Sequence, residues 1–104
     1  MDIQTLNDNF RKSLLGGKVI LTRGIYSRGQ AFINEILNSV KTFNNFNSKN
    51  DPYNEHDYGS FEYDGQKIMW KIDYYDRNLC CCSTDPTDES KTVRVMTVML
   101  AEEY

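Results

Sequence analysis

Residues 58–75 read Y-G-S-F-E-Y-D-G-Q-K-I-M-W-K-I-D-Y-Y and contain the clearest structural signal in the chain. Asp64-Gly65 separates two runs of strand-forming residues, and a two-residue Asp-Gly connection is typical of a type I′ hairpin turn. Such a turn sets the register of the two strands. We therefore expect Phe61 to lie opposite Ile68 and Gly59 opposite Trp70, where the missing glycine side chain leaves room for the indole.

The second strand of this hairpin has two different faces. Alternation of side chains along a strand puts four apolar or aromatic residues on one face, which we expect to form part of the core: Ile68, Trp70, Ile72 and Tyr74. The other face carries Met69 and Tyr75, with Tyr58 from the first strand. Extending the same register outward predicts that His56 lies beside Asp73.

Two amphipathic helices precede the hairpin. Apolar residues at helical spacing predict a first helix, over residues 3–14, that stops at Gly16-Gly17. Ser27 followed by Gln30 has the spacing of a capping box, and the apolar stripe after it predicts a second helix to about Phe43.

Two more strands complete the predicted architecture. Residues 18–23 form a short run that is rich in β-branched side chains, which indicates a buried strand. Residues 92–100 are apolar on both faces, which favours an interior strand. We predict one α+β domain over residues 1–104, with about four mainly antiparallel strands and two helices packed on one face.

The charge of the chain is unevenly distributed. Of the 104 residues, 12 are Lys or Arg and 15 are Asp or Glu, but residues 51–90 hold three basic and ten acidic side chains. A nucleic-acid-binding protein normally shows a basic excess, so we expect no direct contact with nucleic acid. The acidic middle fits either a protein partner with a basic surface or a charged face that promotes solubility.

The remaining composition points to a reducing compartment. The three cysteines are consecutive, Cys80-Cys81-Cys82, and form neither a disulfide framework nor a common metal motif. No apolar run is long enough to span a membrane. We therefore expect a cytoplasmic protein with no membrane partner, no metal site and no cofactor.

Several motifs resemble a family of small bacterial proteins known only as a domain of unknown function. They are N-D-x-F-R at 7–11, L-T-R-G at 21–24, N-D-P-Y-x-E-H-D-Y-G at 50–59, W-K-I-D-Y-Y-D at 70–76, D-P-x-D at 85–88 and R-V-x-T-x-M-L-A-x-E-Y at 94–104. The cysteine run departs from the family pattern. The resemblance implies no activity, but it implies an origin in bacterial chromosomes and mobile elements, where anti-defence roles occur.

The first functional hypothesis is a non-enzymatic protein-binding module. Tyr and Met on an uncovered sheet face are typical of contact surfaces. The alternative is that the 77–91 loop covers this face. The expected contact residues are Tyr58, Met69, Asp73, Tyr75, Asp76, Asp85 and Asp88. The most concrete version is an anti-CRISPR-like inhibitor that presents carboxylates to a nucleic-acid-binding partner. Self-association through the open face, giving a homodimer, is a further expectation.

The second hypothesis is a small hydrolytic enzyme, metal-assisted or histidine-based, centred on the E-H-D-Y-G loop. Its catalytic residues would be His56, Asp57, Asp73 and Arg23, with the histidine as general base. The competing interpretation is structural: His56 pairs with a carboxylate and the loop aspartates bind backbone amides.

Overall fold

The computed structural model describes residues 1–104, and its hairpin confirms the register predicted from the sequence. β2 (Tyr58–Tyr63) pairs antiparallel with β3 (Gln66–Tyr75), with Phe61 opposite Ile68 and Gly59 opposite Trp70. Asp64 and Gly65 have φ angles of 52° and 76°, the left-handed values that a type I′ turn requires. A Cβ atom at Gly59 would lie 2.5 Å from Trp70 Nε1, so the close approach of the indole excludes any side chain there.

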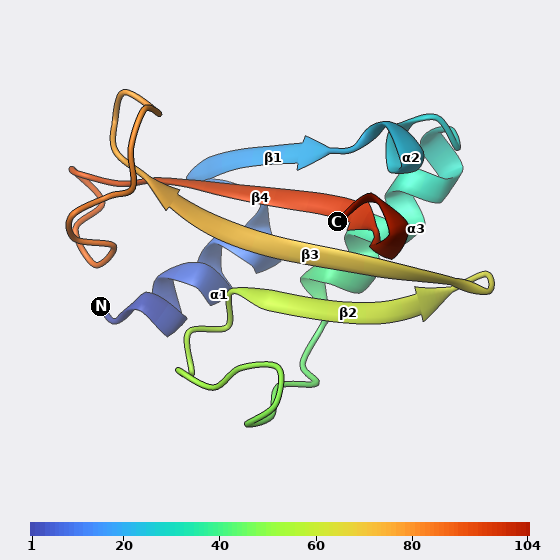
Figure 1. The fold of residues 1–104 in the computed structure, drawn as a ribbon, viewed down its shortest axis with the longest axis horizontal. Helices are drawn as coiled ribbons and strands as arrows, with labels where there is room; N and C mark the ends of the chain where they lie inside the picture. The colour runs from blue at the N-terminus through green and yellow to red at the C-terminus, as the bar shows by residue number, and fades with distance from the viewer.

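The hairpin is half of a mixed four-stranded sheet with the order β1-β4-β3-β2 (Figure 1). β4 (Val93–Leu100) lies in the interior, as predicted, and pairs antiparallel with β3. β1 (Gly17–Leu21) pairs parallel with β4 and forms one edge of the sheet. The prediction of a buried strand here is wrong, because an edge strand has a neighbour on one side only and Ile20 is 49% exposed.

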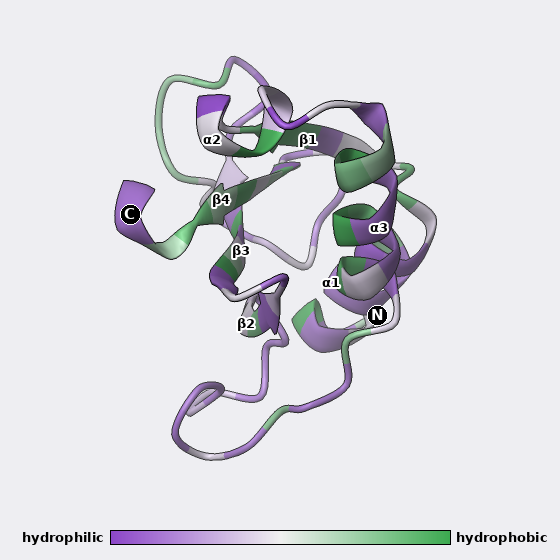
Figure 2. Cartoon of the chain, turned by 90° about the vertical axis from the view of Figure 1, so that its right-hand side faces the viewer, coloured by the Kyte–Doolittle hydropathy of each residue, from purple (hydrophilic) through white to green (hydrophobic).

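Two helices cover one face of this sheet, which confirms the predicted α+β class. α1 (Ile3–Ser13) and α3 (Gln30–Lys41) lie on the same side of the strands (Figure 2). The opposite face, turned toward the viewer in Figure 1, carries no long helix and is called the open face below.

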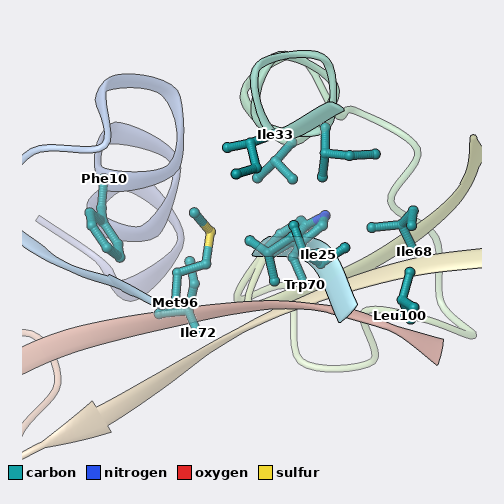
Figure 3. Close-up of a cluster of buried hydrophobic side chains, with 11 residues drawn as sticks. Phe10, Ile25, Ile33, Ile68, Trp70, Ile72, Met96 and Leu100 are labelled. Atoms are coloured by element: carbon teal, nitrogen blue, oxygen red, sulfur yellow. The ribbon is translucent and has the colours of Figure 1, made fainter. Parts of the chain in front are cut away.

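The core lies between the helices and the sheet. Trp70, Ile68 and Ile72 point from β3 toward the helices, and Met96 and Val98 point the same way from β4. Phe10 and Ile33 meet them from α1 and α3 (Figure 3). Burying these side chains supplies the main driving force for folding.

The helix ends differ from those expected. α3 begins after Gly29, whose φ is 93°, and its first turn has no side-chain cap, so the predicted capping box is wrong. Ser27 instead ends α2 (Arg23–Tyr26), a short helix that was not predicted. α1 ends with Leu14 in the left-handed conformation, two residues before the glycine pair expected to stop it.

The C-terminal segment returns to α2. It forms a short 3₁₀ helix, η1 (Ala101–Glu103), directly after β4. The carboxylate of Glu103 accepts hydrogen bonds from the Thr22 hydroxyl at 2.6 Å and the Gly24 amide at 2.9 Å. Arg23 therefore starts a helix held by the end of the chain.

Candidate functional site

The loop that contains E-H-D-Y-G is organised around the buried carboxylate of Asp51. Asp51 Oδ1 accepts the backbone amides of Glu55 at 3.0 Å and His56 at 3.1 Å. Asn54 and His56 both have left-handed backbone conformations, with φ of 56° and 55°. These two residues let the chain curl around the carboxylate, so the loop has a defined shape without a helix or strand of its own.

His56 lies between two carboxylates. Its Nδ1 is 2.9 Å from Asp8 Oδ1, and its Nε2 is 3.5 Å from Asp51 Oδ2. The ring stacks on Phe46 with a centroid separation of 3.8 Å. The hydrogen bond of the ring is the one between Nδ1 and Asp8, whereas the buried Oδ2 atom of Asp51 has no hydrogen-bond partner.

Arg11 completes this group and is almost entirely buried. One guanidinium nitrogen donates to the backbone carbonyls of Val40, Lys41 and Phe43, where α3 ends, and the other donates to Asp8 at 3.0 Å. The guanidinium also lies over the Trp70 ring. We name Asp8, Arg11, Asp51 and His56 the inner charge cluster, because they pair two acids with two bases and join α1, α3 and the loop.

A second buried network lies beside the first. The Asn7 amide donates to the Glu55 carbonyl at 3.0 Å and to the Tyr74 hydroxyl at 2.7 Å, and its oxygen accepts from Arg94 Nε at 2.7 Å. Tyr74 in turn donates to the Glu55 carboxylate. Burial raises the pKa of Tyr74 well above its ordinary value, so this phenol stays protonated and acts as a hydrogen-bond donor.

The four residues of the catalytic hypothesis are not assembled into one site. The predicted placement of His56 beside Asp73 is wrong, because the β2 ladder begins at Tyr58 and the left-handed backbone at His56 turns the ring toward α1. Asp73 instead pairs with Lys71 at 3.2 Å on the open face. Arg23 starts α2, which lies at the other end of the sheet from the start of β2 (Figure 1).

Asp57 and Asp73 do come together in one shallow depression, which is also lined by Tyr75 and Cys82. Partial burial raises the pKa of Asp57, and the neighbouring charges of Glu55, Asp51 and Asp73 raise it further. No group of three or more His, Cys, Asp or Glu side chains has an arrangement that could hold a metal ion.

The open face brings together four of the predicted contact residues. Tyr58, Met69, Asp73 and Tyr75 all project from it, since they alternate with the core residues of β2 and β3. The 77–91 loop touches this face at one end only, where Leu79 lines a groove with Tyr75. Most of the open face is therefore left uncovered by the loop.

The other three predicted contact residues lie in and beside that loop. Asp76 accepts the amides of Asn78 and Cys80, Asp85 accepts from Thr87, and Asp88 accepts from Ser90. These hydrogen bonds lower the pKa of Asp85 and of Asp88. Both carboxylates thus keep their negative charge while shaping exposed turns. We name residues 76–92 the acidic loop; Figure 1 shows it at the end of β3.

Sequence reasoning missed four residues of the buried networks, namely Asn7, Asp8, Arg11 and Arg94. Asp8 and Arg11 stand three residues apart on one helix, a spacing at which opposite charges pair. That spacing was the available signal. The other partners of Arg11 gave none, because they are backbone carbonyls at the end of a different helix.

Comparison with known proteins identifies the family and nothing more specific. The family model described as "Protein of unknown function (DUF3768)" matches residues 21–103, so the chain belongs to this family. No curated protein and no solved structure matches the chain. None of its helices has the length and apolar character needed to cross a membrane.

Proposed function

We propose that this DUF3768 protein is a non-enzymatic protein-binding module whose partner presents a basic surface. The observation that carries the proposal is an uncovered sheet face with Tyr58, Met69 and Tyr75 that continues directly into the acidic loop. Aromatic and methionine side chains are enriched at protein interfaces, and a flanking charged rim supplies specificity.

The charge of the acidic loop supports a basic partner. Asp76, Asp85 and Asp88 satisfy local backbone amides with one carboxylate oxygen and still carry negative charge at an exposed end of the molecule. The loop holds four acidic and two basic side chains, and a net negative charge attracts a positive surface over a distance of about a Debye length and accelerates association.

The partner class follows from this chemistry. Strongly basic protein surfaces commonly bind phosphates, and fixed carboxylates compete for such a surface. The proposed partner is therefore a nucleic-acid-binding protein, and the proposed effect is competition with its nucleic acid. In bacteria, a nucleic-acid-targeting defence complex such as a CRISPR effector has such a surface, and a phage or mobile element would benefit from its inhibition.

The enzymatic alternative lacks comparable support. A general base needs a ring nitrogen free to reach a substrate. Both nitrogens of His56 face carboxylates within the inner charge cluster, and one side of its ring is covered by Phe46. We therefore assign these residues to holding the loop against α1.

The test is a capture experiment from bacterial lysate at low and moderate salt, quantified by mass spectrometry. An acidic-end variant replaces four aspartates by asparagine, which keeps an acceptor oxygen but removes the charge: Asp73, Asp76, Asp85 and Asp88. The matched control neutralises four carboxylates elsewhere: Glu35, Glu62, Asp64 and Glu102. The proposal predicts a partner that the wild type and the control capture, that moderate salt releases, and that the acidic-end variant loses.

Equal capture by the acidic-end variant and the wild type would contradict the proposal. So would the absence of any captured protein at low salt. Purified partner then allows a second measurement, in which the protein displaces a labelled oligonucleotide from it. Failure of the acidic-end variant alone to displace the oligonucleotide would link the carboxylates to competition.

A further inference from the structure

The outer edge of β1 has unpaired backbone groups with a regular arrangement. The Thr22 amide donates to the Val98 carbonyl, so in this parallel pair the even-numbered residues of β1 bind β4. The amides and carbonyls of Gly17, Val19 and Leu21 consequently point away from the sheet. In Figure 1 no other segment runs along this edge.

The two edges of the sheet differ in how they are protected. The other edge, β2, carries Glu62 and is flanked by Asp57 and Asp64, so two such edges would repel each other. β1 has Lys18 as its one charged residue and leaves Ile20 49% exposed. Natural proteins protect sheet edges with charges, and an edge with so little charge is open to pairing.

We propose that two copies of this chain pair through β1, antiparallel and centred on Val19. The free groups of Gly17, Val19 and Leu21 then lie opposite those of Leu21, Val19 and Gly17 in the second copy. Each opposed pair can exchange both of its N–H···O bonds, so the sheet continues from one copy into the other. The proposal does not depend on the acidic loop or on its partner.

The side chains of β1 match in this register. On the helix-covered face Leu21 lies opposite Gly17, and Val19 lies opposite its own copy, a β-branched cross-strand pair. On the open face Lys18 lies opposite Ile20, so neither lysine directly faces the other. Gly17 can accept no side chain, because a Cβ atom there would lie 2.5 Å from the Arg94 carbonyl oxygen.

This contact is short, and it predicts a concentration-dependent dimer. A single pair of five-residue strands buries less surface than a permanent dimer needs. Pairing also joins the open faces of the two copies along one continuous sheet. The groove that Ile20 lines with Tyr75, Val95 and Leu79 would lie next to the junction in each copy.

The register is tested by sedimentation velocity of the full chain from low micromolar to near-millimolar concentration. Ile20→Lys places a second lysine opposite Lys18, and like charges directly opposite are destabilising, so we expect the dimer to be lost. Ile20→Glu places a carboxylate opposite Lys18 in both halves, so we expect a severalfold tighter dimer that weakens again with salt. Ile20 is exposed, and both variants should retain the monomer fold.

Ser60→Lys on the outer edge of β2 is the matched control and should leave the dimer unchanged. Amide exchange followed by NMR gives a second readout, in which Val19 and Leu21 become protected as concentration rises. A wild-type chain that stays monomeric throughout, an Ile20→Glu dimer no tighter than that of Ile20→Lys, or sensitivity to Ser60→Lys alone would each overturn the proposal.

Discussion

The two prolines of this chain both follow an aspartate, yet their loops do opposite things. Asp51, before Pro52, is buried, and its carboxylate holds two amides and faces His56. Asp85, before Pro86, directs its carboxylate to Thr87 within an exposed turn. The same dipeptide thus occurs in an inward loop, residues 44–57, that packs against the core, and in the acidic loop, which presents charge to solvent.

The difference comes from what each loop packs against. The inward loop lies on α1, where Asp8 and Arg11 offer complementary charges in a partly buried place. The acidic loop satisfies its aspartates within itself, through its own amides and hydroxyls and through Lys91, which lies 4.0 Å from Asp88 on an exposed turn. An Asp-Pro turn therefore does not reveal its role until its surroundings are known, and substitutions in the two loops should have very different effects.

The largest effect on stability is expected in the inner charge cluster, from the substitution Arg11→Met. This change leaves Asp8 without its arginine and removes the guanidinium donor from three carbonyls at the end of α3. Breaking a buried charge pair costs about 3–5 kcal/mol of unfolding free energy. Urea denaturation followed by circular dichroism measures this loss. Lys12→Met, on the exposed side of the same helix, is the control and should retain the wild-type midpoint.

Exchanging the two Asp-Pro aspartates for alanine tests the comparison itself. Asp51→Ala removes a buried acceptor from two part-buried amides and leaves His56 with one carboxylate, so we expect a loss of about 2–4 kcal/mol of unfolding free energy. Asp85→Ala should shift the denaturation midpoint within the scatter of the measurement. Similar midpoints for the two variants would show that the inward loop is no more structural than the acidic loop.

Gly59→Ala tests the packing at the start of β2, directly after the inward loop. The added methyl group would overlap Trp70 and Phe43, and overpacking of this kind costs about 1–3 kcal/mol. Trp70 is the only tryptophan, so its fluorescence reports the disturbance directly. Ser60→Ala, one residue further along the strand, should change neither stability nor the emission maximum.

The smallest effect on stability is expected at Asp57, just before β2, where substitution should stabilise the protein instead of destabilising it. Burial raises the pKa of Asp57, so its ionised form destabilises the folded protein at neutral pH. Asp57→Asn should therefore raise the melting temperature slightly at neutral pH. The gain should disappear at about pH 3, below the ordinary carboxyl pKa, where the aspartate is protonated in both states. A lower melting temperature at neutral pH would argue against this account.

The parts of the fold that could be predicted are those that local chemistry determines. The Asp64-Gly65 turn and the alternation after it set the β2–β3 register, and an apolar run on both faces identified β4 as interior. The parallel pairing of β1 could not be derived, because it depends on contacts with residues far along the chain.

The site was harder to predict for two physical reasons. His56 adopts a left-handed backbone, which is uncommon for a residue other than glycine, so the extended register failed at that point. Arg11 binds backbone carbonyls, which leave no mark in the sequence. The open-face residues, in contrast, followed from simple alternation along two strands.

The central claim is that the partner contacts the open face and the acidic loop, whereas the inner charge cluster and the loop over residues 44–57 stabilise the fold. Hydrogen exchange of the chain, free and bound to its captured partner, tests it most directly. We predict that binding slows amide exchange in the acidic loop and along the edge of β2, whose side chains meet the open face, while residues 44–57 exchange as they do in the free chain. Protection confined to the inward loop around His56, with the acidic loop unchanged, would contradict the account.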